Sequence, residues 1–339
     1  MLSSQFLRGL LPLFLTIVML VFGLPAGSQQ PISAEDQQPI STMKVNVNVV
    51  NVYCNVKDKH GALIPDLHKE DFQLFEDGSP QTVKYFSAET DQPLTLGLLI
   101  DTSPSQQRVL PMEQQVGGAF LDQVLRSKDL AFLIGFDANV DLLQDYTSSA
   151  RDLRQAMDRV RIGGGGFAGG APGIGQGPFP TSNRACCTAL YDAIYLAAGE
   201  KLAHEVGRKA MILLTDGEDE GSKMKIRDAI EAAQKADAIC YVILIADRNF
   251  YGGMGYSGDS AMRQLTEDTG GRVIQVGNKP DKLKTAFDQI ANELRSQYGI
   301  GYTPTNLKKD GSFRKIEVRS KEGYKVQARR GYYAIQQED

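Results

Sequence analysis

Three oxygen-bearing side chains, Asp101, Ser103 and Ser105, stand at alternate positions directly after an apolar run that ends at Ile100. An almost continuous apolar run indicates a strand buried on both faces, as in a parallel sheet. In open α/β sheets, ligands bind outside the carboxyl ends of the strands. The three side chains therefore start at the ligand-binding edge, where they can converge on one point.

Two further oxygen-bearing residues are expected at the same edge. A second apolar run ends at Leu214, and Asp216 follows it closely. Between the two runs, Thr188 opens residues 188–202, which have helical periodicity, so its hydroxyl can face this edge from the start of a helix. The candidate metal ligands are Asp101, Ser103, Ser105, Thr188 and Asp216.

The donor set determines which ion it suits. Hydroxyl and carboxylate oxygens are hard ligands, suited to Mg²⁺, Ca²⁺ or Mn²⁺. Two carboxylates and three neutral hydroxyls leave such an ion short of anionic oxygen. We therefore expect the ion to take one more oxygen from an Asp or Glu of a protein partner, which is a mechanism of adhesion and not of catalysis.

These residues resemble the metal-ion-dependent adhesion site of von Willebrand factor A (VWFA) domains. The Asp-x-Ser-x-Ser motif is complete, Thr188 lies in Thr-Ala-Leu-Tyr-Asp-Ala-Ile, and Asp216 lies in Thr-Asp-Gly. The resemblance covers residues 93–297. It implies that Ser103, Ser105 and Thr188 bind the metal directly, with Mg²⁺ as the expected cation, and that Asp101 and Asp216 often act through water. The whole chain also resembles bacterial exported VWFA-related proteins.

A structural alternative exists for each of these positions, because Ser, Thr and Asp are common in turns and at the ends of strands. Asp192, in the predicted helix after Thr188, is expected to lie on the helix surface or to support a ligand. The glycine-rich residues 163–177 lack the Gly-Lys-Ser/Thr of a phosphate loop and are interpreted as a flexible insertion. Residues 248–259, with aromatic side chains among glycines, form either a contact loop or a structural loop.

The residues around the motif alternate between two patterns. Apolar runs predict parallel strands, and stretches with helical periodicity lie between them. This alternation predicts a doubly wound, mainly parallel α/β sheet. The strands are expected at 94–100, 130–136, 210–214, 239–245 and 272–276, and the helices at 109–125, 150–160, 188–202, 223–236, 260–269 and 281–296.

Segments with β-strand character lie on both sides of this region, at residues 44–92 and 298–335. Each is too short to form a stable sandwich alone. We therefore expect them to pair into one smaller all-β, sandwich-like domain, with the α/β domain of residues 93–297 inserted between them.

The N-terminus predicts export. Arg8 is the only charged side chain before Glu35, and an apolar stretch precedes the helix-breaking Gly23 and Pro25. Residues 1–28 are interpreted as a signal peptide, with an uncleaved membrane anchor as the alternative, and residues 29–43 as a polar linker. Both interpretations place the rest of the chain outside the cytoplasm: periplasmic, on the cell surface or secreted.

Composition excludes some functions and leaves others open. With 37 basic and 41 acidic residues among 339, the chain lacks the basic excess typical of nucleic-acid binding. Its four cysteines, Cys54, Cys186, Cys187 and Cys240, form neither a disulfide framework nor a zinc pattern, and their redox state is left open.

An enzymatic role is not expected. Asp101-Thr102-Ser103 occurs once, whereas aspartic proteases need two paired carboxylates, and no Gly-x-Ser-x-Gly motif is present. The predicted function is a non-enzymatic, exported protein-binding module. The alternatives are a scaffold of an envelope assembly with a structural metal and, less favoured, a hydrolase.

Overall fold

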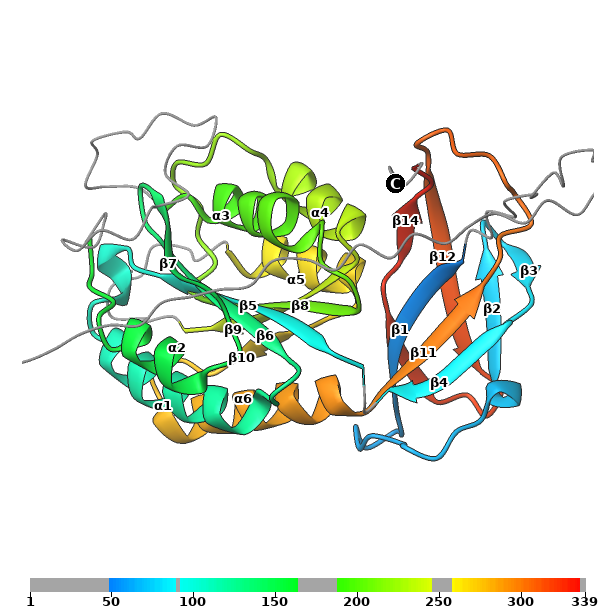
Figure 1. The fold of residues 1–339 in the computed structure, drawn as a ribbon, viewed down its shortest axis with the longest axis horizontal. Helices are drawn as coiled ribbons and strands as arrows, with labels where there is room; N and C mark the ends of the chain where they lie inside the picture. Colours follow the sequence, from blue (N-terminus) through cyan, green and yellow to red (C-terminus); the bar gives the residue numbers. More distant parts are fainter. Residues whose placement is uncertain (1–48, 90–91, 164–187, 246–257, 336–339) are drawn as a thin grey trace, which may run out of the picture. The chain divides into compact units, whose positions relative to one another are not determined.

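The computed structural model describes residues 49–89, 92–163, 188–245 and 258–335 (Figure 1). The predicted signal peptide, the linker, nearly all of the glycine-rich segment and most of residues 248–259 lie outside these ranges, as do Cys186 and Cys187. In the described part, no helix combines the length and apolar character that a membrane span requires.

A six-stranded sheet forms the larger part of the fold. Its strand order is β10-β9-β8-β5-β6-β7, and every neighbouring pair is parallel except β6 and β7. The strands are β5 (Leu94–Asp101), β6 (Leu130–Phe136), β7 (Val140–Thr147), β8 (Arg208–Thr215), β9 (Ala238–Leu244) and β10 (Val273–Gln275).

Helices cover both faces of this sheet (Figure 1). On one face lie α1 (Leu110–Val124), α2 (Ala150–Met157) and α6 (Pro280–Arg295). On the other lie α3 (Leu190–Leu196), its π-helical continuation η3 (Ala197–Leu202), α4 (Ile226–Lys235) and α5 (Gly258–Thr269). The central strands are apolar on both faces because each face packs against helices. The predicted doubly wound sheet is therefore confirmed.

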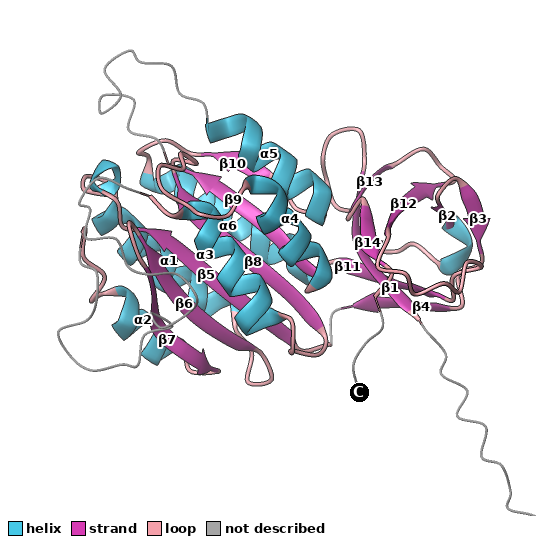
Figure 2. Ribbon diagram, turned by 90° about the horizontal axis from the view of Figure 1, so that it is seen from above, coloured by secondary structure: helices cyan, strands magenta, loops and turns pink. Residues whose placement is uncertain are grey.

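The flanking segments form two antiparallel four-stranded sheets, with orders β13-β1-β11-β4 and β14-β12-β2-β3. Apolar side chains from both sheets form one core, and Figure 2 shows the strands of the two sheets gathered together. The strands are β1 (Val50–Lys57), β2 (Phe72–Glu76), β3 (Ser79–Gln81), β4 (Tyr85–Glu89), β11 (Gln297–Tyr302), β12 (Phe313–Ser320), β13 (Lys325–Ala328) and β14 (Gly331–Tyr333).

The pairing of these strands joins the segment before the α/β part to the segment after it. β1 pairs with β11 and β12 pairs with β2, both antiparallel, so N-terminal strands bond to C-terminal ones. The all-β part is thus completed only after the α/β part has been traversed, as the fold prediction required. Both parts belong to one compact unit.

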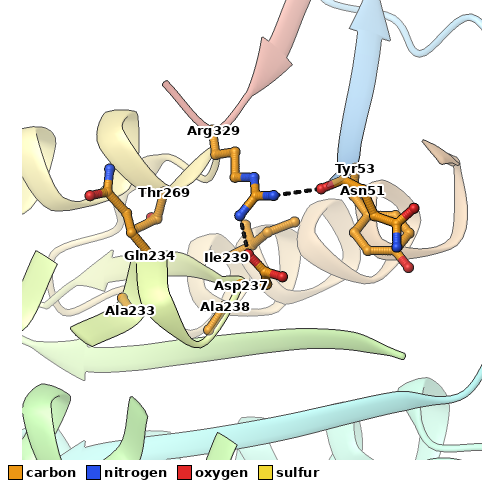
Figure 3. A pocket seen from close by; sticks show the side chains of 9 residues that line it. All are labelled: Asn51, Tyr53, Ala233, Gln234, Asp237, Ala238, Ile239, Thr269 and Arg329. Carbon is orange, nitrogen blue, oxygen red and sulfur yellow. Dashed lines mark hydrogen bonds and ion pairs between the residues drawn. The ribbon is translucent and has the colours of Figure 1, made fainter. Parts of the chain in front are cut away.

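A small pocket lies between β1 and the turn from α4 to β9 (Figure 3). The Arg329 guanidinium donates hydrogen bonds to the Asp237 carboxylate and, at 2.6 Å, to the Asn51 carbonyl oxygen. The cavity volume is about 10 Å³, whereas a small-molecule site usually exceeds about 300 Å³. This region therefore forms a contact between the two parts of the fold and is too small to bind a small molecule.

Candidate metal centre

Asp101 is the last residue of β5, and its side chain is completely buried. One carboxylate oxygen, Oδ1, accepts a hydrogen bond from the Ser103 backbone N–H at 2.9 Å. The other, Oδ2, accepts from the Thr215 hydroxyl at 2.7 Å. Thr215 ends the neighbouring strand β8, so the carboxylate is held by two adjacent strand ends.

The two serines and Asp216 form a continuous chain of oxygen atoms. The Ser103 and Ser105 hydroxyl oxygens lie 2.9 Å apart, and the Ser105 hydroxyl donates to Asp216 Oδ2 at 2.6 Å. A 3₁₀ turn, Pro104–Gln106, follows Ser103, with a proline whose fixed φ suits the first helical position. The turn also positions Gln106, whose Nε2 donates to Asp216 Oδ2 at 2.8 Å.

Thr188 lies one residue before the N-cap of α3 and is mostly buried. Its carbonyl oxygen accepts from Glu220 N–H at 3.0 Å, in the segment after Asp216. The next N–H, of Ala189, donates at 2.6 Å to the carbonyl of Asp137, which follows β6. Thr188 is therefore tied to the same edge by its backbone. Among the described residues, no hydrogen bond joins its hydroxyl to the other four candidates.

Asp192 has a clear structural role. Its carboxylate accepts from the backbone N–H groups of Lys223, at 3.0 and 3.1 Å, and of Met224, at 2.8 Å. In return, the Ser222 hydroxyl oxygen accepts from the N–H groups of Tyr191 and Asp192 at 3.0 and 3.1 Å. These bonds fasten the segment between β8 and α4 to the start of α3, next to Thr188.

The candidate site brings two acidic side chains, Asp101 and Asp216, to one edge of the sheet. Burial and, to a smaller extent, the neighbouring Asp216 charge raise the pKa of Asp101 to about 7, against hydrogen bonds from Ser103 and Thr215 that lower it. A bound cation would stabilise the charged forms of two neighbouring carboxylates. The residues fit a hard divalent ion, because hydroxyl and carboxylate oxygens already lie within 2.6–2.9 Å of one another.

Three contributors were not identified from the sequence: Thr215, Gln106 and Glu113. Thr215 and Gln106 touch residues more than 100 positions away, so no local pattern indicates their role. Glu113 does carry a signal, because it lies on the buried face of α1, four residues after Val109 and four before Gly117.

The comparisons with known proteins concern the fold. No protein-family model matches the chain, and no curated protein matches it. Similar solved structures do exist. The conserved hypothetical protein BatB from Bacteroides thetaiotaomicron is 17% identical, with a TM-score of 0.43, and the match covers 60% of this chain and 100% of that one.

Two further structures extend this comparison. A von Willebrand factor type A protein from Catenulispora acidiphila is 14% identical, with a TM-score of 0.43 over 79% of this chain and 74% of that one. Proximal thread matrix protein 1 from the mussel byssus is 16% identical, with a TM-score of 0.47 over 65% of this chain and 51% of that one.

Von Willebrand factor A domains are therefore among the structures that this chain is similar to. At identities of 14–17%, these three likenesses concern the fold alone. No ligand, metal or partner is inferred from these likenesses.

Proposed function

We propose that this chain is an exported, non-enzymatic protein-binding module that uses a divalent cation, with Mg²⁺ expected, to bind an Asp or Glu side chain of a partner. The cation would be held by Asp101, Ser103, Ser105, Thr188 and Asp216. One observation carries the proposal: the chain of Ser103, Ser105 and Asp216 oxygens at the carboxyl edge of the sheet, beside the buried Asp101 carboxylate.

The chemistry of this donor set supports adhesion. When bound, the cation would supply a strong, localised positive charge at the sheet edge. Mg²⁺ demands about six oxygen ligands and usually keeps several waters when bound by one or two carboxylates. A partner carboxylate can replace one of those waters, so affinity for the partner would depend on the cation.

A binding role also agrees with what surrounds the site. General acid–base catalysis most often uses histidine, and the three histidines of this chain, His60, His68 and His204, are all exposed. One oxygen of Asp101 accepts from the Ser103 backbone N–H and the other from the Thr215 hydroxyl. A carboxylate held in this way suits a fixed anion better than a nucleophile.

The test is a calorimetric titration of the full chain with Mg²⁺. We expect binding by the wild type and a loss of at least about tenfold in affinity for Asp101→Asn and Ser105→Ala, since each removes an oxygen donor or its charge. Asp288→Asn is the matched control, because Asp288 is on the surface of α6 and its ion-pair partner in the described part of the chain is Lys284.

A second measurement addresses the partner. A pull-down from envelope extract is expected to capture a protein in Mg²⁺, to lose it in EDTA, and to lose it with Asp101→Asn. Capture that is unchanged in EDTA would refute metal-bridged adhesion and favour the scaffold interpretation. Turnover of a peptide or phosphoester substrate would instead support a hydrolase.

A further inference from the structure

Glu113 lies in the first turn of α1 and has an exposed fraction of 0%. Neither of its carboxylate oxygens has a hydrogen-bond partner among the described residues. No ion pair to Glu113 occurs in that part of the chain either. A fully buried carboxylate without donors is rare in folded proteins, and it calls for a specific explanation such as an ion.

The surroundings of Glu113 indicate that such an ion would be a cation. Two successive backbone hydrogen bonds connect Glu113 to the candidate metal centre: its N–H donates to the Val109 carbonyl, and the Val109 N–H donates to the carbonyl of Gln106, whose side chain bonds Asp216. Burial raises the pKa of Glu113, and the charges of Asp101 and Asp216 add to that rise. A third oxygen is also unpartnered there. Gln106 donates through Nε2 to Ser105 and Asp216, but its Oε1 is buried and has no donor among the described residues.

Glu113 is not a further direct ligand. The described residues contain no group of three acidic, histidine or cysteine side chains arranged to hold one metal ion. The glutamate must therefore act on a cation from outside its immediate ligands. Buried charges interact over such a separation because the effective dielectric constant inside a protein is far below that of water.

We propose that Glu113 supplies a third negative charge to the cation site and, together with Gln106 Oε1, accepts hydrogen bonds from water held by the cation. This inference rests on the proposed function, since it concerns the same site. A divalent cation would then experience three carboxylate charges, two from its candidate ligands and one, from farther away, of Glu113. Glu113 would strengthen cation binding and, by the same charge, weaken the attraction of the loaded site for an acidic partner.

The probe is Mg²⁺ alone, titrated calorimetrically into the wild type, Glu113→Gln, Glu113→Asp and Asp101→Asn. Glu113→Gln preserves the shape of the side chain and removes its charge. We expect its affinity for Mg²⁺ to fall about tenfold or more. Glu113→Asp restores the charge and is expected to recover part of the loss.

Glu76→Gln is the matched control, because Glu76 is also buried, at 3% exposed, but lies in the sandwich with its own donors. Its affinity for Mg²⁺ is expected to stay within twofold of the wild type. Thermal unfolding in EDTA supplies a second readout. Removing an unpartnered charge is expected to leave the midpoint of the metal-free protein unchanged or higher, whereas loss of a structural side chain would lower it.

The outcomes separate the two proposals. If Asp101→Asn abolishes Mg²⁺ binding and Glu113→Gln stays within twofold of the wild type, the role of Glu113 is refuted and the proposed function stands. If the wild type binds no Mg²⁺, both fail. If Glu113→Gln loses affinity and also unfolds at a clearly lower temperature in EDTA, a structural role replaces the one proposed here.

Discussion

Glu76 in the sandwich and Glu113 beside the parallel sheet are both almost fully buried, with exposed fractions of 3% and 0%. Glu76 accepts hydrogen bonds from the hydroxyls of Tyr302, at 2.6 Å, and Tyr332, at 3.0 Å, and pairs with the Arg314 guanidinium at 3.4 Å. Glu113 has none of these: its two oxygens lack donors within the described ranges.

The difference separates a polar group whose partners complete the fold from one for which we propose a nearby cation. In the sandwich, Arg314 also donates to the carbonyls of Asn306 and Lys308, so one ion pair organises a loop as well as the core. At the sheet edge, the unsatisfied oxygens lie near two more carboxylates. Within the described ranges, the buried carboxylate oxygens that lack donors both belong to Glu113.

The largest effect is expected from breaking the completed network. Arg314→Met would leave Glu76 buried without its cation, and removal of one partner of a buried pair usually costs about 3–5 kcal/mol. Urea unfolding should show this loss in the free energy of unfolding. Affinity for Mg²⁺ is expected to remain at the wild-type value. A variant as stable as the wild type would show that the tyrosine hydroxyls suffice for Glu76.

The converse experiment adds Mg²⁺ to the candidate metal centre beside the parallel sheet. At a Mg²⁺ concentration 100 times its Kd, binding to the folded state alone would stabilise the protein by about 2.7 kcal/mol. We expect this increment in the wild type and equally in Arg314→Met, because the partners of Arg314 among the described residues, Glu76, Asn306, Lys308 and Tyr332, all belong to the sandwich. Asp101→Asn should show almost none of it. Thermal unfolding with and without Mg²⁺ measures all three.

Asp192→Ala tests the support of the site. The change removes the acceptor for the Lys223 and Met224 N–H groups and is expected to cost about 2 kcal/mol, since two partly buried donors lose this acceptor. It also frees the segment that holds Thr188, so we expect Mg²⁺ affinity to fall several-fold. Unchanged affinity in a destabilised Asp192→Ala would mean that Thr188 is placed independently of this clamp.

Much of the fold could be predicted from the sequence, because its physical causes are local. Strands β5, β8 and β9 read as apolar runs since helices cover both of their faces. Edge strand β7 (Val140–Thr147) was not predicted. Its residues are mostly half-buried and lack strict alternation, which leaves little pattern to detect.

The candidate site likewise combines contacts that the sequence predicts with contacts that it does not. Spacing alone brings Asp101, Ser103 and Ser105 together, because all three belong to one strand end and its turn. Partners from distant segments, such as Thr215 on Asp101, depend on strand register and could not be predicted. Whether Thr188 and the other candidates hold a metal stays a prediction from sequence and chemistry.

The smallest effects come from two glycines with left-handed backbones, one in each region. Gly217, with φ +85°, follows Asp216, and an added Cβ would lie 3.1 Å from side-chain atoms of Leu244 and Met262. Gly311, with φ +74°, is in a sandwich turn with open space around it.

Each substitution by alanine is expected to cost about 1 kcal/mol from backbone strain, as measured by urea unfolding. Only Gly217→Ala should also weaken Mg²⁺ binding. The backbone has to shift to relieve the strain and the close contacts of the new methyl group, and this shift displaces the neighbouring Asp216 carboxylate. Equal loss of Mg²⁺ affinity in Gly311→Ala would show that general loosening, and not the position of Asp216, controls the site. No loss in either variant would show that Asp216 tolerates movement, as expected if it acts through water.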